Sequence, residues 1–300
     1  MKHPTLPFSA LACSLGFIAC LLSASATAED TLSKIRRSKT FTIAYMQVAP
    51  FSYQDKNQQV VGYSIDLCRK IAAAVKQKLK LNDLSIQFLP VDSGGRFSKV
   101  IGSQADIECG ATTNTAERRS RVSFTIPHFF SGVRMIARAS SGIKNWSDLK
   151  NRTIAITQNS TTIDLVDARS NVRSLNIKVV EGRDPNAAFA LVEQGKADAF
   201  AVDDVLLYSL RAASARPQDF VITGEPLSVE PYSLMFRKDD TEFKNLVDLE
   251  MIRMIASGEF EKIYNDWFLR AIDDQHPNMK MPMSFLLRDS LRFPSDKTAD

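Results

Sequence analysis

Residues 109–119 have the layout of an anion-binding turn. A short apolar stretch ends at Gly110, two threonines and an asparagine follow, and Arg118 arrives at helical spacing after them. A strand that runs into a helix N-terminus would gather hydroxyls, free backbone N–H groups and one guanidinium at a single point, which suits a carboxylate. An ordinary capped helix with a solvated arginine explains the same residues, so the choice depends on the rest of the chain.

Two earlier segments follow predicted strands and carry residues suited to the same kind of ligand. Ser93 is followed by Arg96 at the start of a predicted helix. A cation there opposes the helix dipole, which a bound anion would offset, although a solvated arginine is the alternative. Gln47 and Phe51 lie in the loop after the first predicted strand. The aromatic ring can cover an apolar part of a ligand or can simply pack the loop.

The second half of the chain offers a matching set. Ser160 and Thr161 join a strand to a helix, where one of them should cap the helix and spare donors could face an anion. Asp203 and Asp204 follow another strand. One should cap the next helix, and the other, for which we favour Asp203, is then free to accept an ammonium group. A carboxylate on Arg118 and an amine on Asp203 match an α-amino acid.

Strands and helices alternate through most of the chain. Strands are predicted over 41–45, 84–91, 105–109, 153–157, 177–180, 199–202 and 233–236, and helices over 68–79, 96–101, 162–169, 187–194, 205–212 and 241–267. This alternation predicts an α/β fold of parallel sheets wrapped by helices. It forms two sets, joined by two crossing segments at 128–133 and 227–232. We therefore expect two lobes and a ligand in the cleft between them.

The first 28 residues are predicted to be a signal peptide. An apolar run over 8–22 is short for a spanning helix, and Ala26-Thr27-Ala28 is a small-x-small cleavage site, so the exported chain starts at Glu29. A lipoprotein site at Cys20 is the alternative. Cleavage removes Lys2 from the 38 basic residues and none of the 34 acidic ones, which leaves a net charge of +3. That balance argues against nucleic acid or an anionic membrane surface as a partner.

Two cysteines, Cys68 and Cys109, remain after cleavage. Exported proteins often join such a pair in a disulfide, although two buried thiols that pack as small apolar groups are possible. No His or Cys cluster has the spacing of metal ligands, so neither a metal nor another cofactor is predicted.

Four segments resemble the periplasmic amino-acid-binding proteins of ABC transporters, solute-binding protein family 3, and most of all the glutamate/aspartate-binding branch. They are residues 62–67, 108–118, 201–204 and 237–240, in order and at comparable spacing. The resemblance implies the type II two-lobed fold, with lobe I over 29–130 and 232–300, lobe II over 131–231 and a hinge of two crossing strands. It implies a periplasmic monomer that closes on an amino acid and delivers it to a membrane permease.

The resemblance also implies roles by position. Arg118 matches the arginine of the α-carboxylate, and Thr113 and Thr161 match hydroxyl residues near it. The carbonyl of Ala111 and the carboxylate of Asp203 match the contacts of the amine. Ser93 and Arg96 match contacts of the acidic branch with the side-chain carboxylate.

Two contacts of that branch are missing. Its arginine before Pro-Phe is replaced by the sequence Met46-Gln47-Val48-Ala49, and its histidine is absent near Pro185. A polar neutral amino acid such as glutamine or asparagine, meeting Gln47 and Ser93, is therefore the alternative ligand.

A periplasmic dehydratase of prephenate-like acids on the same scaffold is a further alternative. It would need a general acid or base in the cleft. His128 and His276 look structural, and Glu108 and Glu230 are possible acids without supporting spacing. We therefore expect a binding protein without catalytic residues.

Overall fold

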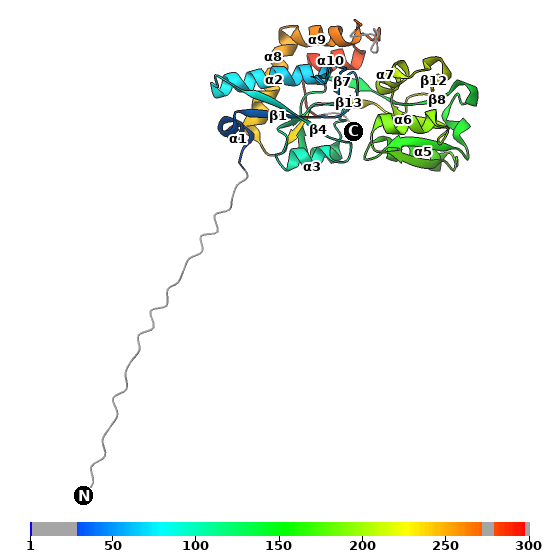
Figure 1. The fold of residues 1–300 in the computed structure, drawn as a ribbon, viewed down its shortest axis with the longest axis horizontal. Helices are drawn as coiled ribbons and strands as arrows, with labels where there is room; N and C mark the ends of the chain where they lie inside the picture. The colour runs from blue at the N-terminus through cyan, green and yellow to red at the C-terminus, as the bar shows by residue number, and fades with distance from the viewer. Residues whose placement is uncertain (2–28, 272–278, 298–300) are drawn as a thin grey trace.

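The computed structural model describes residue 1, residues 29–271 and residues 279–297. Nearly all of the predicted signal peptide, and His276, lie outside the described residues. Within the described ranges, no helix is both long and apolar enough to cross a membrane. Figure 1 shows two α/β lobes side by side, each built on its own five-stranded sheet. The chain therefore has the two-lobed fold of the type II class that was predicted.

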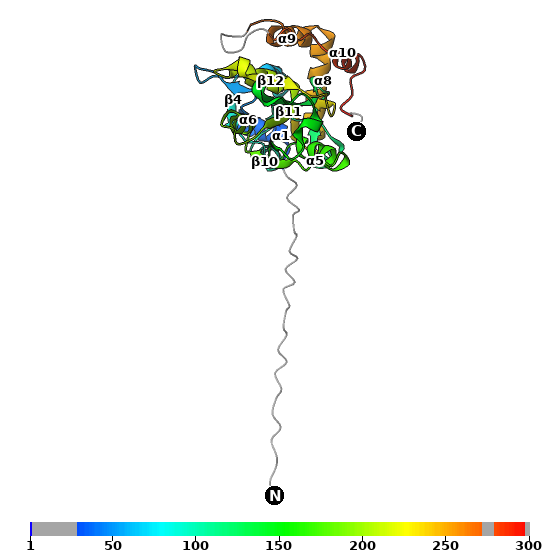
Figure 2. The ribbon, with the colours of Figure 1, turned by 90° about the vertical axis from the view of Figure 1, so that its right-hand side faces the viewer.

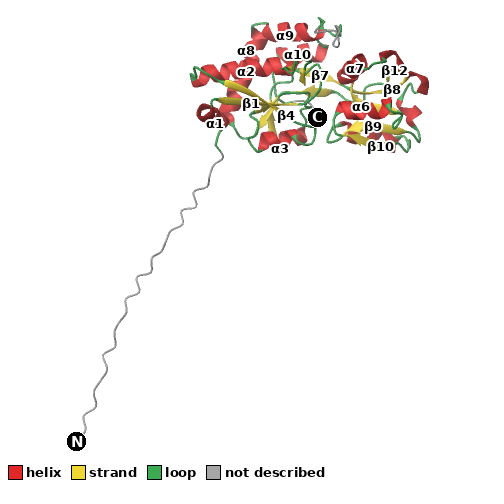
Figure 3. Ribbon diagram, in the orientation of Figure 1, coloured by secondary structure: helices red, strands yellow, loops and turns green. Residues whose placement is uncertain are grey.

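The first lobe is built on the strand order β4-β1-β5-β14-β6. Its strands are β1 (Thr40–Tyr45), β4 (Ser85–Pro90), β5 (Ile107–Glu108), β6 (Val122–Phe124) and β14 (Met235–Arg237), with a small hairpin of β2 (Tyr53–Gln54) and β3 (Val60–Val61). Its helices are α1 (Thr31–Ser38), α2 (Tyr63–Leu79), α3 (Arg96–Ile101), α4 (Ala116–Arg119), α8 (Thr241–Ala256), α9 (Glu259–Phe268) and α10 (Phe285–Arg292). Strands β1 and β4 lie between α2 on one side and α3 on the other (Figure 3).

The second lobe is built on the strand order β10-β9-β11-β8-β12. Its strands are β8 (Val133–Arg138), β9 (Thr153–Thr157), β10 (Lys178–Gly182), β11 (Ala199–Asp203) and β12 (Phe220–Thr223). Its helices are α5 (Thr162–Val172), α6 (Pro185–Glu193) and α7 (Asp204–Ala213), with short 3-10 turns at Ala139–Ser141, Trp146–Leu149 and Pro217–Asp219.

Two antiparallel strands run between the lobes. They are β7 (Phe129–Ser131) and β13 (Glu230–Tyr232), and both lie within the segments predicted to cross. The β13 strand also holds the anion-binding turn, because Thr113 forms a bridge with Tyr232 and the Asn114 N–H donates to the carbonyl of Pro231. The connection therefore places part of the predicted site directly beside the hinge.

Two structural expectations were wrong. The sheets are mixed rather than parallel, since β14 is antiparallel to β5 and β8 is antiparallel to β11. The helix predicted over 241–267 is two helices, α8 and α9, because Gly258 between them takes a left-handed conformation with φ of 76°. The helix expected after the anion-binding turn is present as α4, which is a single turn capped by Thr115.

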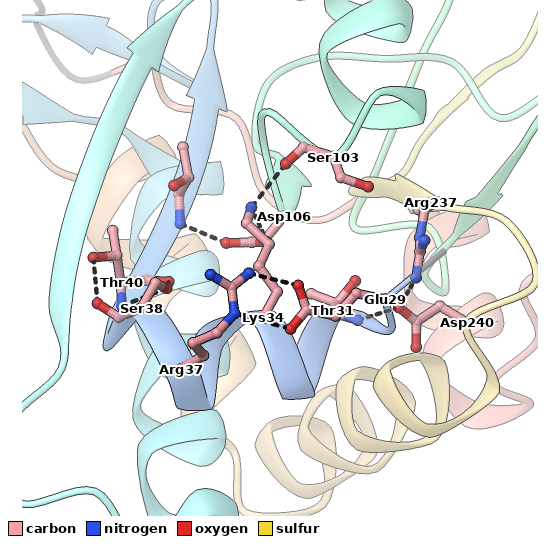
Figure 4. Close-up of polar contacts among 11 residues, drawn as sticks. Glu29, Thr31, Lys34, Arg37, Ser38, Thr40, Ser103, Asp106, Arg237 and Asp240 are labelled. Atoms are coloured by element: carbon pink, nitrogen blue, oxygen red, sulfur yellow. Dashed lines mark hydrogen bonds and ion pairs between the residues drawn. The ribbon is translucent and has the colours of Figure 1, made fainter. Parts of the chain in front are cut away.

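Helix α1 fastens two strands that carry the site. Lys34 pairs with Asp106, just before β5, at 2.9 Å. Asp240 accepts a hydrogen bond from the Thr31 N–H at 2.7 Å and pairs with Arg237, at the end of β14, at 2.9 Å (Figure 4). Both carboxylates are buried and partnered, as buried charges need to be. Helix α1 thus stabilises β5 and β14 from the side away from the cleft.

Cys68 of α2 and Cys109 at the end of β5 form a disulfide that joins residues 41 apart in sequence. The bond lies one residue before Gly110, so it fastens the start of the anion-binding turn to the first lobe. The first lobe also carries the α8–α10 layer, which stands at the top of both Figure 1 and the end-on view in Figure 2.

The described part of the C-terminal tail lies on the first lobe, as expected. Leu287 of α10 is buried, and the Met281 N–H donates to the carbonyl of Phe268. At the end of this segment, the Asp296 carbonyl accepts a hydrogen bond from Asn114 Nδ2 at 2.8 Å, and its carboxylate pairs with Lys244. The tail therefore returns to the anion-binding turn.

Candidate functional site

A cavity between the lobes is lined by both of them. The first lobe contributes Met46, Val48, Ser93, Arg96, Ala111, Thr113 and Arg118, and the second contributes Thr157, Ser160, Thr161, Pro185, Val202, Asp203 and Leu206. Seven of the nine predicted ligand residues are brought together here, and Gln47 and Phe51 are not. The cavity continues into a wider groove that Asn159 and Glu230 also line.

Arg118 presents its guanidinium at the mouth of this cavity. Its Nη1 donates to the carbonyl of Thr113 at 2.9 Å, and its Nη2 reaches the carbonyl of Asn159, in the other lobe, at 3.5 Å. Burial lowers the pKa of Arg118 from its usual value. Since α4 is only one turn long, the group of this turn best suited to an anion is the guanidinium rather than the helix N-terminus.

Arg96 is the second cation of the cavity and is only 4% exposed. It donates to the carbonyl of Ser93 and, through Nη2, to that of Asn159 at 3.4 Å. Burial and the charge of Arg118 lower the pKa of Arg96 to about 10, so it stays cationic at neutral pH. Both guanidinium groups lie over the ring of Phe97, at 4.9 Å for Arg96 and 5.5 Å for Arg118. Two neighbouring like charges favour an anion between them.

Asp203 provides the opposite charge from the second lobe. It occupies the position that precedes α7, yet its side chain makes no capping hydrogen bond. Asp204 instead accepts a hydrogen bond from Ser131 at 2.8 Å. Burial, together with the neighbouring carboxylate of Glu230, raises the pKa of Asp203 to about 8. An ammonium group bound there would lower that pKa and favour the ionised form.

The expectation that Ser160 or Thr161 caps α5 was wrong. No side chain caps this helix at Thr161, and Ser160 donates to the carbonyl of Thr157 at 2.6 Å. Thr161 Oγ1 donates to Glu230 Oε2 at 3.0 Å. Thr161 thus faces the cleft, and Glu230 of β13 joins the site. From the sequence, Glu230 was considered only as a possible acid of an enzyme. Its position in the predicted crossing segment 227–232 was the signal that could have placed it at the cleft.

Two predicted ligand residues lie elsewhere. Phe51 is fully buried in an aromatic cluster with Tyr63, Phe129, Tyr232 and Phe268, so it packs the first lobe and does not line the cavity. Gln47 is exposed at the rim, where its side chain accepts a hydrogen bond from the Gln54 N–H and its carbonyl accepts one from Asn186 of α6. The loop folds back through a bridge between Val48 and Ser52, which turns Phe51 inward. Met46 and Val48 face the cavity in their place.

The described residues show no cluster of side chains that could hold a metal ion. His128 is fully buried against the rings of Phe51 and Tyr63, and burial lowers its pKa to about 3. It is therefore neutral and inaccessible to a ligand, which agrees with the structural role predicted for it.

Residues 41–270 match the family model of bacterial extracellular solute-binding proteins, family 3. The chain belongs to this family. One relative is an L-glutamate/L-aspartate-binding protein of Pseudomonas aeruginosa, which is 36% identical over 292 residues. Another is a glutamate/aspartate import solute-binding protein of Escherichia coli strain K12, which is 34% identical over 298 residues. The alignments cover 96% and 99% of this chain and 97% and 98% of those relatives.

Solved structures with the same fold include binding proteins for other amino acids. An ancestral arginine-binding protein bound to glutamine is 26% identical with a TM-score of 0.68, and covers 77% of this chain and 98% of its own. An ancestral amino acid-binding protein described as a precursor of cyclohexadienyl dehydratase is 25% identical with a TM-score of 0.66, and covers 79% of this chain and 99% of its own. The two named relatives are thus binding proteins, and one structural neighbour is a binding protein described as the precursor of an enzyme.

Proposed function

We propose that this chain is a periplasmic, monomeric receptor that captures glutamate or aspartate between its lobes and presents it to the permease of an ABC transporter. The observation that carries the proposal is the pair of neighbouring guanidinium groups, Arg96 and Arg118, that line one cavity. Arg118 holds the α-carboxylate with Thr113 and Thr161. Arg96 holds the side-chain carboxylate with Ser93. Asp203 and the carbonyl of Ala111 receive the amine.

The placement of Gln47 favours an acidic ligand over a neutral one. A glutamine or asparagine ligand was the alternative because Gln47 and Ser93 could meet a neutral side chain. Gln47 lies on the rim and hydrogen-bonds to Gln54, so it does not serve that role. The loop that replaces the arginine of the acidic branch contributes Met46 and Val48 to this cavity, and Pro185, near the position of the missing histidine, lines it as well. These residues make the cavity more apolar, so the second carboxylate depends on Arg96 and Ser93.

A panel of the twenty amino acids tests this assignment by thermal unfolding. A ligand that binds only the folded state raises the unfolding temperature in proportion to the logarithm of its concentration. We expect glutamate and aspartate to give the largest shifts, confirmed by calorimetry. A larger shift with a neutral or basic amino acid contradicts the proposal. Recovery of unchanged glutamate, and no turnover of a cyclic diacid, should separate a receptor from a dehydratase.

Replacing Arg96 by Gln should change which ligand is preferred. The side-chain carboxylate loses its cation, which costs about 3–5 kcal/mol for a buried charge without a partner, while a neutral side chain loses one hydrogen bond worth about 1 kcal/mol. Glutamate affinity should fall at least about 100-fold and glutamine affinity by less than about tenfold. Arg121→Gln is the matched control, because Arg121 is exposed and lies over the same Phe97 ring at 5.4 Å. An equal loss for both ligands would assign Arg96 to the α-carboxylate instead.

A further inference from the structure

A buried carboxylate lies beneath the cavity and has no role in the scheme above. Glu108 at the end of β5 is 0% exposed. Neither of its carboxylate oxygens makes a hydrogen bond of normal geometry among the described residues, although the Thr112 hydroxyl lies near enough to favour the ionised form. A side chain at position 110 would collide with Glu108 Oε1, so Gly110 leaves the room that this carboxylate fills. The same position lies 3.4 Å from Met46 Cε, and Met46 lines the cavity. Glu108 is therefore directly below the floor of the site.

The charged groups that act on Glu108 electrostatically are the two cavity arginines. Arg96 comes from α3 and Arg118 from α4, and the electrostatic attraction of each favours the ionised form of Glu108. The residues paired with Glu108 on the neighbouring strands, Ala44 of β1 and Met235 of β14, carry no charge. Burial opposes ionisation more strongly than the arginines favour it, and it raises the pKa of Glu108 to about 7.

We propose that Glu108 is a proton-linked counter-ion of Arg96 and Arg118, which takes up a proton when a ligand with a side-chain carboxylate binds. This inference rests on the proposed function. A bound glutamate carries one net negative charge, and its side-chain carboxylate pairs with Arg96, whose charge otherwise acts on Glu108. A like charge brought close to a buried carboxylate favours its protonated form. A neutral amino acid brings no such charge, and Glu108 then remains the counter-ion of Arg96.

The sign of the pH dependence follows from this linkage. Binding of the diacid raises the pKa of Glu108 above its free value of about 7. The complex then holds more protons than the free protein, so the contribution of Glu108 to affinity is fully present below pH 7 and is lost as the pH rises through the higher value. Asp203 acts in the opposite direction, because the ligand ammonium lowers its pKa from about 8 and releases a proton. Acidic and neutral amino acids both cause that release. The difference in proton uptake between glutamate and glutamine therefore reports on Glu108 alone.

Calorimetry at pH 8 in buffers of different ionisation enthalpy tests the inference. Glutamate should take up about half to one proton more than glutamine in the wild-type protein, and the uptake with glutamate should fall by the same amount in Glu108→Gln. Glu242→Gln, at an exposed position of α8, is the control and should behave as wild type. Glu108→Met provides a second way to remove the carboxylate if the amide prevents folding.

The outcomes separate this inference from the function it rests on. Equal proton uptake for glutamate and glutamine in the wild type overturns the role of Glu108, as does unchanged uptake with glutamate in the Glu108 variants. In either case glutamate binding itself stands. A wild-type protein that binds no acidic amino acid overturns both the function and the inference.

Discussion

Replacing Arg118 by Ala should abolish amino-acid binding at physiological concentrations. The variant leaves the ligand α-carboxylate in the cavity without a cation, and breaking a buried ion pair in this way costs about 3–5 kcal/mol. The dissociation constant should therefore rise at least about 100-fold. Removal of Arg118 also takes away a charge that favours the ionised form of Asp203. The ligand amine then meets a less ionised carboxylate, which weakens binding further. Calorimetry with glutamate measures the loss.

Two further variants make the Arg118 result specific. Arg121→Ala removes an exposed arginine three residues after Arg118, and it should bind as wild type. Arg118→Lys keeps the charge but loses the planar fork that holds a carboxylate with two bonds, so it should recover only part of the affinity. A folded Arg118→Ala protein that binds within tenfold of wild type would remove Arg118 from the site.

Removal of the disulfide should have the largest effect on stability. The bond closes a loop of 41 residues between Cys68 and Cys109, and loop-closure entropy predicts a loss of about 4 kcal/mol without it. The double variant Cys68→Ala/Cys109→Ala should unfold at a much lower urea concentration, with a steeper slope because the unfolded chain is no longer cross-linked. Because the bond holds the start of the anion-binding turn, glutamate affinity should fall as well.

Reduction of the wild-type protein is the matched comparison, since it breaks the bond and keeps both sulfur atoms in the core. Both samples should lose a similar free energy of unfolding. A loss below about 1 kcal/mol in the reduced protein would mean that packing of α2 against β5, rather than the covalent bond, holds the anion-binding turn.

The sequence predicted best where one local pattern decides the outcome. Ile71 and Val75 repeat at helical spacing, and both are buried on α2. Polar residues directly after buried strands were also informative, because the carboxyl ends of strands meet at one edge of a sheet. Asp203 directly after β11 and the Thr113–Arg118 segment after β5 were predicted in this way, and they line one cavity from two separate lobes.

The errors share a different cause, because each depends on contacts made outside the local pattern. Alternation of strands and helices does not reveal that β8 and β14 return antiparallel, since their direction is decided by the crossings between lobes. The direction of Phe51 depends on how its loop folds back at Val48. Thr161 has the sequence position of a helix cap, but its hydroxyl donates to the carboxylate of Glu230, which is 69 residues away in the sequence.

The path of the C-terminal segment has a practical consequence for biosensors. Its last described residues lie against Asn114, which lines the wider groove together with Thr113 of the site. Helix α1, which begins two residues after Glu29, lies at the far side of the first lobe. A fluorescent reporter or surface tether fused to the C-terminus would therefore crowd the cleft entrance. One attached before Glu29 would leave it open, which makes the N-terminal end the better point for immobilisation.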